Sequence, residues 1–533
     1  MSVKGEFKGK RLIENPPSRC RVSTMESFSE EPKKEGEERE ASPSFREVYP
    51  LKEPHVYAAV STDPKTLGLK YLVIEPTLTE EEKKALGRIK EILFQVLDVD
   101  LRSLGGREKA EEWLRGYVKR VVKGYKVRVG EGSLDKIEYY LLRDLINYGK
   151  IDPLMHDHMI EDISCDGPRI PIYVWHRRYE SLPTNIVFED EDELDSFVVR
   201  LAYLAGKHIS IANPLLDASL PDGSRIQLTY GREVTRKGST FTIRRFRADP
   251  LTVTDLITFN TMNSDMAAWL WLMIEKKANI LIGGGTASGK TTTLNALSAF
   301  IPPDQKIITI EDTAELNLPH ENWISSVARI GFGSAGSAEI TLFDLLKAAM
   351  RQRPDYVIVG EVRGEEAFTL FQAMATGHGG LSSIHCDSVV SAFNRLESEP
   401  MNIPKTLLPT LDVVVMQSKV RLADQTVRRI TSIVEVLELD PVSKEIITSE
   451  VYRWNPRKDS FEYSGKSVLM DRVMEDYGLT REDALREFEN RVMLLDWMAL
   501  NNVRRIDEVG RALREYYADP ERVMEKVKLR LSA

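Results

Sequence analysis

Cysteine and long apolar runs are scarce in this chain of 533 residues. Its three cysteines, Cys20, Cys165 and Cys386, lie far apart and are odd in number, which excludes a complete disulfide framework and a four-thiolate zinc site. The longest apolar run, residues 266–274, is too short for a membrane helix, which needs ~18 to 20 residues. We therefore expect a soluble protein in a reducing, cytoplasmic setting.

Positive charge is also in deficit, because the formal net charge is −9. An acidic chain offers no broad electrostatic attraction to nucleic acid. The first residues lack the apolar segment of a signal peptide, so we expect contact with a membrane only through partners. Hydrophobic residues make up 42% of the chain, which is enough for several buried cores, and the length indicates roughly three or four domains.

The clearest chemical signal is the glycine-rich stretch at residues 283–293. From Gly284 it reads G-x-x-x-x-G-K-T, the pattern of a phosphate-binding P-loop. An apolar strand pattern at 278–282 precedes it, and a helical pattern with Leu294 and Leu297 on one face follows. A strand, a glycine turn and a helix start place backbone N–H groups and the positive helix end around a polyphosphate. The alternative is a glycine-rich turn before an ordinary helix.

The P-loop geometry assigns roles to individual side chains. Lys290 would reach the β and γ phosphates of a nucleotide, and Thr291 would hold Mg²⁺. The predicted nucleotide-binding residues of this stretch are Gly284, Gly285, Thr286, Ala287, Ser288, Gly289, Lys290, Thr291 and Thr292.

The pattern along the chain predicts six segments. Residues 1–45 are predicted to form a disordered leader, because the run 30–40 has no apolar residue to offset its ordering entropy. The other segments are a small α/β-helical module at 46–130, an N-terminal α/β domain at 131–247, a linker at 248–254, a P-loop α/β domain at 255–440, and strands followed by a helical extension at 441–533.

Carboxylates follow two strand patterns of the C-terminal half. The run 306–310 ends on Glu311 and Asp312, and the apolar run 354–360 ends on Glu361. Near-continuous apolar runs fit parallel strands buried on both faces, and open α/β sheets bind ligands outside the carboxyl ends of their strands. We therefore expect these acids beside the P-loop, where Mg²⁺ needs oxygen ligands and the attacking water needs a carboxylate.

Two further groups of residues permit more than one interpretation. His378 and His385 lie beside a glycine turn, and they fit a phosphate sensor, ordinary core or surface histidines, or a zinc site in which Cys386 is the only neighbouring thiol. The strand pattern 241–247 carries three arginines. Guanidinium groups suit phosphate oxygens, but strand arginines by themselves are more typical of a solvated surface.

Taken in order, these segments resemble the secretion ATPase superfamily, the motors of type II secretion, type IV pili and the archaellum. The resemblance covers roughly residues 130–440 and rests on the P-loop, an acidic box at 309–315, a Walker B equivalent at 358–361 and a histidine box at 376–385. Gly360 takes the place of the usual Walker B aspartate, as the family leads us to expect. The four-cysteine zinc insert of many bacterial members is lacking, so the chain is similar to the archaeal branch.

The resemblance implies an α/β fold with a RecA-like P-loop ATPase domain and an α/β (PAS-like) N-terminal domain. It further implies a small N-terminal helical module and a helical C-terminal extension. In this family arginines of the N-terminal domain close over the nucleotide. The implied catalytic residues are Glu361, Glu311, Arg225, Arg244 and Arg245, the implied histidine contacts to the nucleotide are His378 and His385, and the implied Mg²⁺ ligands, direct or through water, are Thr291, Asp312 and Glu361.

The function implied by the resemblance is a homo-hexameric motor that hydrolyses ATP with Mg²⁺. It would power assembly of a type IV pilus-like filament, either an archaeal pilus or an archaellum, or a type II-like secretion process. The motor would be cytoplasmic and peripheral at the inner face of the cell membrane, bound to a membrane-embedded platform protein and not to nucleic acid. The alternatives are a RecA-like nucleic-acid motor, which the acidic net charge disfavours, and a scaffold that binds ATP without hydrolysing it.

Overall fold

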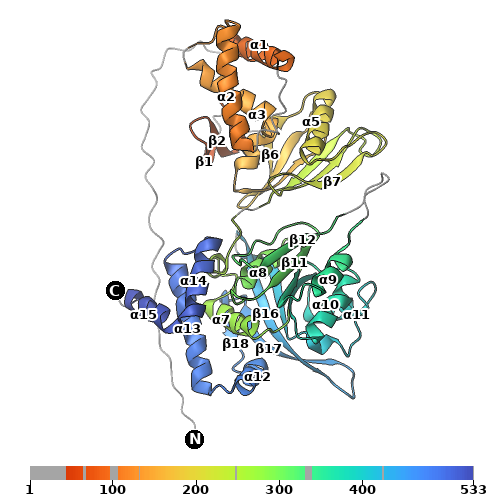
Figure 1. The fold of residues 1–533 in the computed structure, drawn as a ribbon, viewed down its shortest axis with the longest axis vertical. Helices are drawn as coiled ribbons and strands as arrows, with labels where there is room; N and C mark the ends of the chain where they lie inside the picture. Colours follow the sequence, from red (N-terminus) through yellow and green to blue (C-terminus); the bar gives the residue numbers. More distant parts are fainter. Residues whose placement is uncertain are drawn as a thin grey trace.

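The computed structural model describes residues 44–63, 66, 68–96, 106–130, 132–246, 249–329, 339–422 and 425–531. Nearly all of the predicted leader, Cys20 and the start of the predicted linker lie outside these residues. The described chain forms an N-terminal part and a C-terminal part, each built on its own nine-stranded sheet and covered by helices (Figure 1). The predicted α/β fold is therefore confirmed.

The sheet of the N-terminal part has the strand order β1-β2-β3-β6-β5-β4-β9-β8-β7. Its neighbours are antiparallel except β3 and β6, which meet in parallel. The strands are Ser44–Lys52 (β1), Val56–Thr62 (β2), Leu69–Ile74 (β3), Ile160–Cys165 (β4), Pro171–His176 (β5), Glu180–Val187 (β6), Leu215–Ser219 (β7), Arg225–Thr229 (β8) and Thr240–Arg244 (β9). The helices are Glu80–Val96 (α1), Arg107–Gly124 (α2), Ser133–Leu145 (α3), Asp152–His156 (α4) and Glu191–Leu204 (α5).

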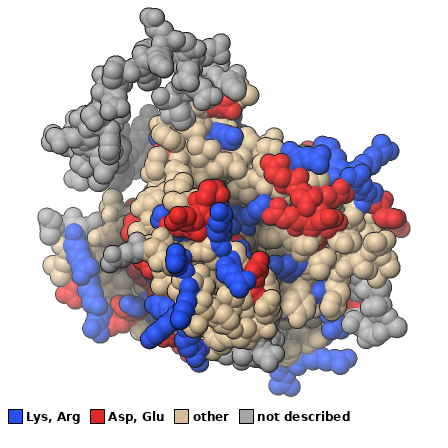
Figure 2. Space-filling model, turned by 90° about the horizontal axis from the view of Figure 1, so that it is seen from above, with Lys and Arg blue, Asp and Glu red and all other residues tan. Residues whose placement is uncertain are grey.

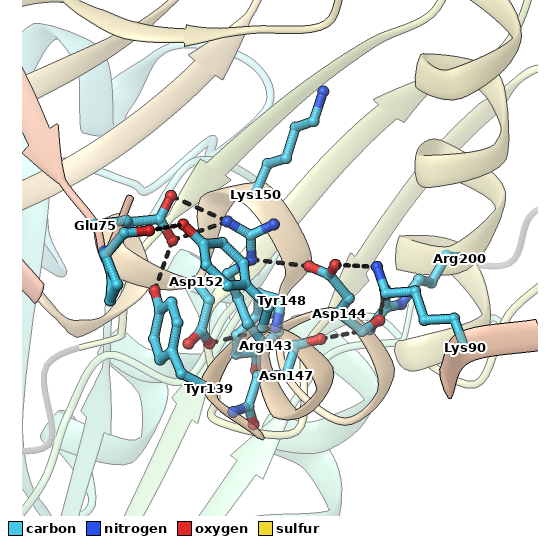
Figure 3. Close-up of polar contacts among 12 residues, drawn as sticks. Glu75, Lys90, Tyr139, Arg143, Asp144, Asn147, Tyr148, Lys150, Asp152 and Arg200 are labelled. Carbon is cyan, nitrogen blue, oxygen red and sulfur yellow. Dashed lines mark hydrogen bonds and ion pairs between the residues drawn. The ribbon is translucent and has the colours of Figure 1, made fainter. Parts of the chain in front are cut away.

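The structure does not divide this part at residue 130, where the sequence predicted a boundary. β1–β3 extend the sheet that β4–β9 form, and α3 shares one apolar cluster with α1 and α2. Polar contacts also join α3 to α1 and to the residue that follows β3 (Figure 3). Arg143 of α3 donates to Glu75 and to its neighbour Asp144 at 2.8 Å each, and Lys90 of α1 donates to Asp144 at 2.6 Å. These long-range contacts, invisible to local sequence patterns, tie the two predicted segments into one unit.

The sheet of the C-terminal part has the order β12-β11-β13-β14-β10-β15-β16-β17-β18. The strands from β12 to β15 run parallel, and β16, β17 and β18 continue the sheet antiparallel. They are Ile280–Gly284 (β10), Ile307–Glu311 (β11), Trp323–Val327 (β12), Tyr356–Val359 (β13), Gly379–His385 (β14), Val413–Leu422 (β15), Gln425–Leu439 (β16), Ile446–Asn455 (β17) and Ser460–Tyr463 (β18).

The order of the parallel strands is that of a RecA-like sheet, because β14 lies between the P-loop strand β10 and the strand β13 that precedes Glu361. Helices cover both faces. Ile280 and Ile282 of β10 face the cluster that contains α7, α8 and the C-terminal helices, while Leu281 faces the cluster of α9–α11. The helices are Val253–Thr258 (α6), Ser264–Glu275 (α7), Lys290–Ser298 (α8), Leu342–Met350 (α9), Glu366–Ala375 (α10), Val389–Glu397 (α11), Val468–Tyr477 (α12), Arg481–Leu500 (α13), Ile506–Ala518 (α14) and Pro520–Leu531 (α15).

The predicted boundary at residue 440 also falls inside one unit, because β17 and β18 belong to the same sheet as β16. The predicted C-terminal helices are present and pack on α7 in the main core. Arg491 of α13, which is buried, joins them to Glu275 of α7 by an ion pair and lies over the ring of Trp271. Within the described ranges, no helix has both the length and the apolar character that crossing a bilayer requires.

Candidate nucleotide-binding site

β10 carries the P-loop sequence into the middle of the C-terminal sheet, between β14 and β15. A Cβ on Gly284, the last residue of β10, would lie 2.4 Å from the carbonyl oxygen of Gln417, so only glycine fits there. Ala287 and Gly289 have φ values of 58° and 96°, and α8 begins at Lys290. These left-handed residues turn the chain sharply between strand and helix, as a phosphate-binding loop requires.

Lys290 lies over this loop, where its Nζ donates to the carbonyl oxygen of Gly285 at 3.2 Å. Burial lowers the pKa of the ammonium group, the negative charge of Glu361 raises it, and the cations Arg363 and Arg244 lower it. These charges surround the ammonium group of Lys290. One of them, Arg244, comes from the N-terminal part of the chain.

Glu311 ends β11 and is almost fully buried. Its Oε1 accepts the N–H groups of Glu315 at 2.9 Å and Leu316 at 3.0 Å, while its Oε2 has no hydrogen-bond partner among the described residues. Burial raises the pKa of the carboxyl to about 7, although the two N–H groups oppose the shift. Gly360 lies against this side chain, since a Cβ there would be 3.2 Å from Cγ of Glu311, and this contact gives a physical reason for glycine before Glu361.

Asp312 and Glu361 meet across the strand ends through a shared cation, Arg363. The guanidinium Nη2 of Arg363 lies 3.0 Å from a carboxylate oxygen of Glu361 and 3.4 Å from one of Asp312. The acidic box and the Walker B equivalent therefore face each other, as the rule on carboxyl ends of parallel strands predicts.

The two histidines are not brought together, which corrects the prediction that both contact the nucleotide. His385 ends β14 and is paired in register with Gly284 of the P-loop strand. His378 precedes the first residue of the same strand, so the two positions are seven steps apart along it, about 23 Å at the usual strand rise. His378 lies at the opposite end of β14, where its Nδ1 is 3.1 Å from the carbonyl oxygen of Ala373.

The predicted glycine turn is present at Gly377, which has a φ of 90° and follows α10, whereas Gly379 and Gly380 belong to β14. A Cβ on Gly379 would lie 2.5 Å from the ring of the buried Tyr356, and one on Gly380 would lie 2.4 Å from Cε of Met374. The glycines are needed for close packing of β14 and not for a phosphate contact.

The three predicted arginines have different environments. Arg244 is exposed and its Nη2 lies 3.5 Å from Glu315, which follows the acidic strand of the other part. Arg225 is the register partner of Arg244 and therefore shares its side of the sheet. Arg245 faces the other way and donates to the carbonyl oxygens of Asp157, Ile160 and Met155, so in this structure it braces the N-terminal part and does not reach the P-loop.

Sequence reasoning missed two residues that contact the P-loop. Gln417 of β15 is buried under Gly284, and Arg428 of β16 donates from Nε to the carbonyl oxygen of Ala287 at 3.1 Å. Gln417 lies inside β15 and not at its end, so the signal that could have marked it is a polar residue directly after the apolar run 413–416. Arg428 lies on an antiparallel strand, and no sequence pattern marks it.

The site offers the oxygen donors that Mg²⁺ prefers. The hydroxyl of Thr291 lies in the first turn of α8, the carboxylates of Asp312 and Glu361 share Arg363, and the unpartnered Oε2 of Glu311 is a further buried acceptor. This donor set fits a hard divalent cation. Thr291, Asp312 and Glu361 are the residues that would hold it, directly or through water.

Comparison with known proteins agrees with the fold. Residues 147–451 match the family described as Type II/IV secretion system protein. The uncharacterized protein MJ0900 of Methanocaldococcus jannaschii is 37% identical over 482 residues, which cover 86% of this chain and 86% of that protein. The conjugal transfer protein TrbB of Rhizobium radiobacter is 41% identical over 189 residues, covering 34% of this chain and 55% of TrbB.

A solved structure also matches part of this chain. The VirB11 ATPase from the type IV secretion system of Brucella suis, in complex with sulphate, is 26% identical, covers 53% of this chain and 91% of that chain, and gives a TM-score of 0.28. The family match spans more than half of the sequence, and the relative from M. jannaschii covers most of both chains. This chain therefore belongs to the family of type II/IV secretion system proteins, the secretion ATPase superfamily.

Proposed function

We propose that this chain is a motor that hydrolyses ATP with Mg²⁺. The observation that carries the proposal is the P-loop turn, which places the ammonium group of Lys290 over the loop at the start of α8, while Arg363 joins the carboxylates of Glu361 and Asp312 at the neighbouring strand ends. A polyphosphate at the P-loop would meet this ammonium, the start of α8 and the two arginines Arg244 and Arg363. A carboxylate at the same edge could orient the attacking water.

The proposed roles follow from these positions. Residues 284–292 bind the phosphates, and Mg²⁺ neutralises their charge when bound. Glu361 orients water, the buried Glu311 supports it, and His385, next to Gly284 in register, donates to the γ phosphate. Arg225 and Arg244 close over the nucleotide from the N-terminal part.

The motor proposal rests on the contact between the two parts. Arg244 lies 3.5 Å from Glu315, which directly follows the acidic box. A nucleotide phosphate would compete with Glu315 for this arginine, so binding and release would move the N-terminal part about the segment near Asp249-Pro250.

The names of two similar proteins refer to conjugal transfer and type IV secretion, and these names suggest the biological process that the motor would serve. We extend this to a homo-hexamer of the archaeal branch that drives a membrane-embedded platform protein. It would assemble a type IV pilus-like filament, an archaeal pilus or an archaellum, or serve type II-like secretion. The motor would act in the cytoplasm at the inner face of the membrane.

No observation favours the nucleic-acid motor that the sequence left as an alternative. Figure 2 views the molecule from the end that carries α1 and α2. Among the described residues visible there, Lys and Arg side chains are intermixed with Asp and Glu and form no continuous basic surface. ATP turnover that DNA stimulates, with a steep loss of stimulation as salt rises, would revive this alternative.

The test is the rate of ATP hydrolysis against protein concentration, measured with the particle mass in the presence and absence of ATP and Mg²⁺. We expect turnover to rise as a ring forms. Lys290→Ala should abolish turnover while the fold stays intact, and Glu361→Gln should bind ATP but hydrolyse it about 100-fold or more slowly, the usual loss for a catalytic base.

The outcomes separate the parts of the proposal. Full activity of a monomer would overturn the motor but leave the P-loop assignment. Normal turnover by Lys290→Ala would overturn the nucleotide site itself, and normal turnover by Glu361→Gln would move the catalytic role to the acidic box.

A further inference from the structure

Arg428 of β16 contacts the second half of the P-loop, at Ala287 and Gly289. Its Nε donates to the carbonyl oxygen of Ala287, which has left-handed backbone angles. The side chain then runs along the loop, because a Cβ on Gly289 would lie 3.2 Å from Cδ of Arg428. Arg428 therefore contacts the two residues whose positive φ values shape the loop.

The hairpin that carries Arg428 is also where the N-terminal part rests on the C-terminal part. Lys419 of β15 is the register partner of Arg428, and its Nζ lies 3.3 Å from Oε1 of Glu180, the first residue of β6. The hydroxyl of Thr426 donates to the same oxygen at 3.3 Å. The ammonium of Lys419 also lies 5.4 Å from the ring centre of Trp175. One carboxylate of the N-terminal part thus holds both strands of the hairpin.

A cation of the N-terminal part also lies near Arg428. Arg177, in the turn between β5 and β6, is close enough that the charge of Arg428 lowers its pKa, in addition to the larger effect of burial. Glu161 lies 3.5 Å from Arg177 and opposes both effects. The contacts of Glu180 with Lys419 and Thr426 therefore link the position of this hairpin to the N-terminal part.

We propose that Arg428 is a positioning residue that fixes the Ala287 carbonyl on the β16 side of the P-loop, and that the contact of Glu180 with the hairpin sets the position of Arg428. A carbonyl oxygen turned toward a phosphate would repel it, so this bond favours the conformation that binds nucleotide. Nucleotide affinity is then coupled to docking of the N-terminal part. The inference rests on the nucleotide binding proposed above.

The experiment measures equilibrium binding of ADP that carries a fluorescent label, so that no hydrolysis is involved. Arg428→Gln should weaken binding about tenfold, the effect of one lost charge-assisted hydrogen bond. Its kcat should change less than its KM, because the substitution impairs nucleotide binding by the loop and not the hydrolysis step. Glu180→Gln should weaken binding about threefold, and the double variant should bind no worse than Arg428→Gln alone, because both act through one bond. Arg421→Gln, which removes an exposed arginine from the same hairpin, is the matched control and should bind like the wild type.

Thermal unfolding of each variant shows whether it folds as the wild type does. Wild-type affinity in a folded Arg428→Gln protein would overturn the positioning role. If the losses from Arg428→Gln and Glu180→Gln multiply in the double variant, the coupling to domain docking is wrong. If the wild-type protein does not bind ADP, the proposed function fails and this inference fails with it.

Discussion

Burial favours the neutral forms of two ionisable side chains at the carboxyl ends of the parallel strands, Lys290 and Glu311. For Lys290 the carboxylate of Glu361 opposes this effect, and a bound phosphate would oppose it further because negative charge stabilises an ammonium group. For Glu311 two backbone N–H groups oppose it, yet the pKa still rises to about 7. The proton affinity of Lys290 would therefore rise when a phosphate binds.

The raised pKa of Glu311 predicts how the stability of the protein changes with pH. Below pH 4.5 both the folded and the unfolded chain hold the proton, so Glu311 contributes no pH dependence. Between pH 4.5 and about 7 the unfolded chain ionises while the folded chain keeps its proton, so the free energy of unfolding falls, by roughly 3 kcal/mol at most. Glutamine needs no proton, so the Glu311→Gln variant should gain stability relative to the wild type as the pH rises.

The measurement is urea unfolding of both proteins at about pH 4 and about pH 8, on either side of this window. Glu321→Gln, which changes an exposed glutamate of the following loop, is the control and should show no such gain. A difference between wild type and Glu311→Gln that stays constant with pH would contradict the raised pKa.

At the scale of elements, β14 shows how one strand can separate residues that a motif groups together. It lies between β13 and β10. Its carboxyl end places His385 beside the P-loop, while His378 lies at its amino end. Its glycines let it lie close to Tyr356 and Met374, so they serve the packing between neighbouring strands and the helix α10. The histidine box is therefore partly a packing motif and partly a site motif.

Replacement of Gly379 by alanine should destabilise the protein without a direct effect on nucleotide affinity. The new Cβ would lie 2.5 Å from the ring of Tyr356, and overpacking of this kind costs about 1 to 3 kcal/mol. Thermal unfolding and labelled ADP binding together test the prediction. Gly116→Ala, in the middle of α2 where a Cβ meets nothing within 4 Å, should instead stabilise by up to about 1 kcal/mol. If a folded Gly379→Ala protein lost ADP affinity, Gly379 would have to be assigned to the nucleotide site.

At the scale of the whole molecule, the candidate site draws on both sheets. The C-terminal sheet supplies the P-loop and the acids, and the end of β9 in the N-terminal sheet supplies Arg244, which reaches Glu315. A second contact, between Glu180 and the β15–β16 hairpin, lies beside the P-loop as well. Movement of one part against the other would therefore change the charges around a nucleotide.

Substitution of Arg244 tests this dependence. Arg244→Gln should lower kcat at least about tenfold, because an arginine that stabilises transferring phosphate contributes strongly to the rate, while ADP binding changes little. Arg232→Gln is a matched control, because Arg232 is equally exposed, at 67%, and pairs with Glu191 inside the N-terminal part. The two variants are compared by steady-state ATP hydrolysis. Equal rates for both would remove Arg244 from the site.

The sequence by itself predicted the P-loop and the two acidic strand ends, and the resemblance to the secretion ATPases implied the RecA-like class. The P-loop and the strand ends are local features, because a buried parallel strand must be apolar along its length and its ligand-binding residues must follow at its carboxyl end. The same rule gave Glu311, Asp312 and Glu361, whose identities need no knowledge of the rest of the fold.

Only the tertiary structure decided which distant residues meet. It assigned β1–β3 and β17–β18 to the two large sheets, directed Arg245 away from the P-loop while Arg244 faces Glu315, and brought Arg428 to Ala287. Strand pairing and side-chain direction depend on partners far along the chain, because a strand alternates its faces and any edge can accept a neighbour. No local pattern encodes that choice.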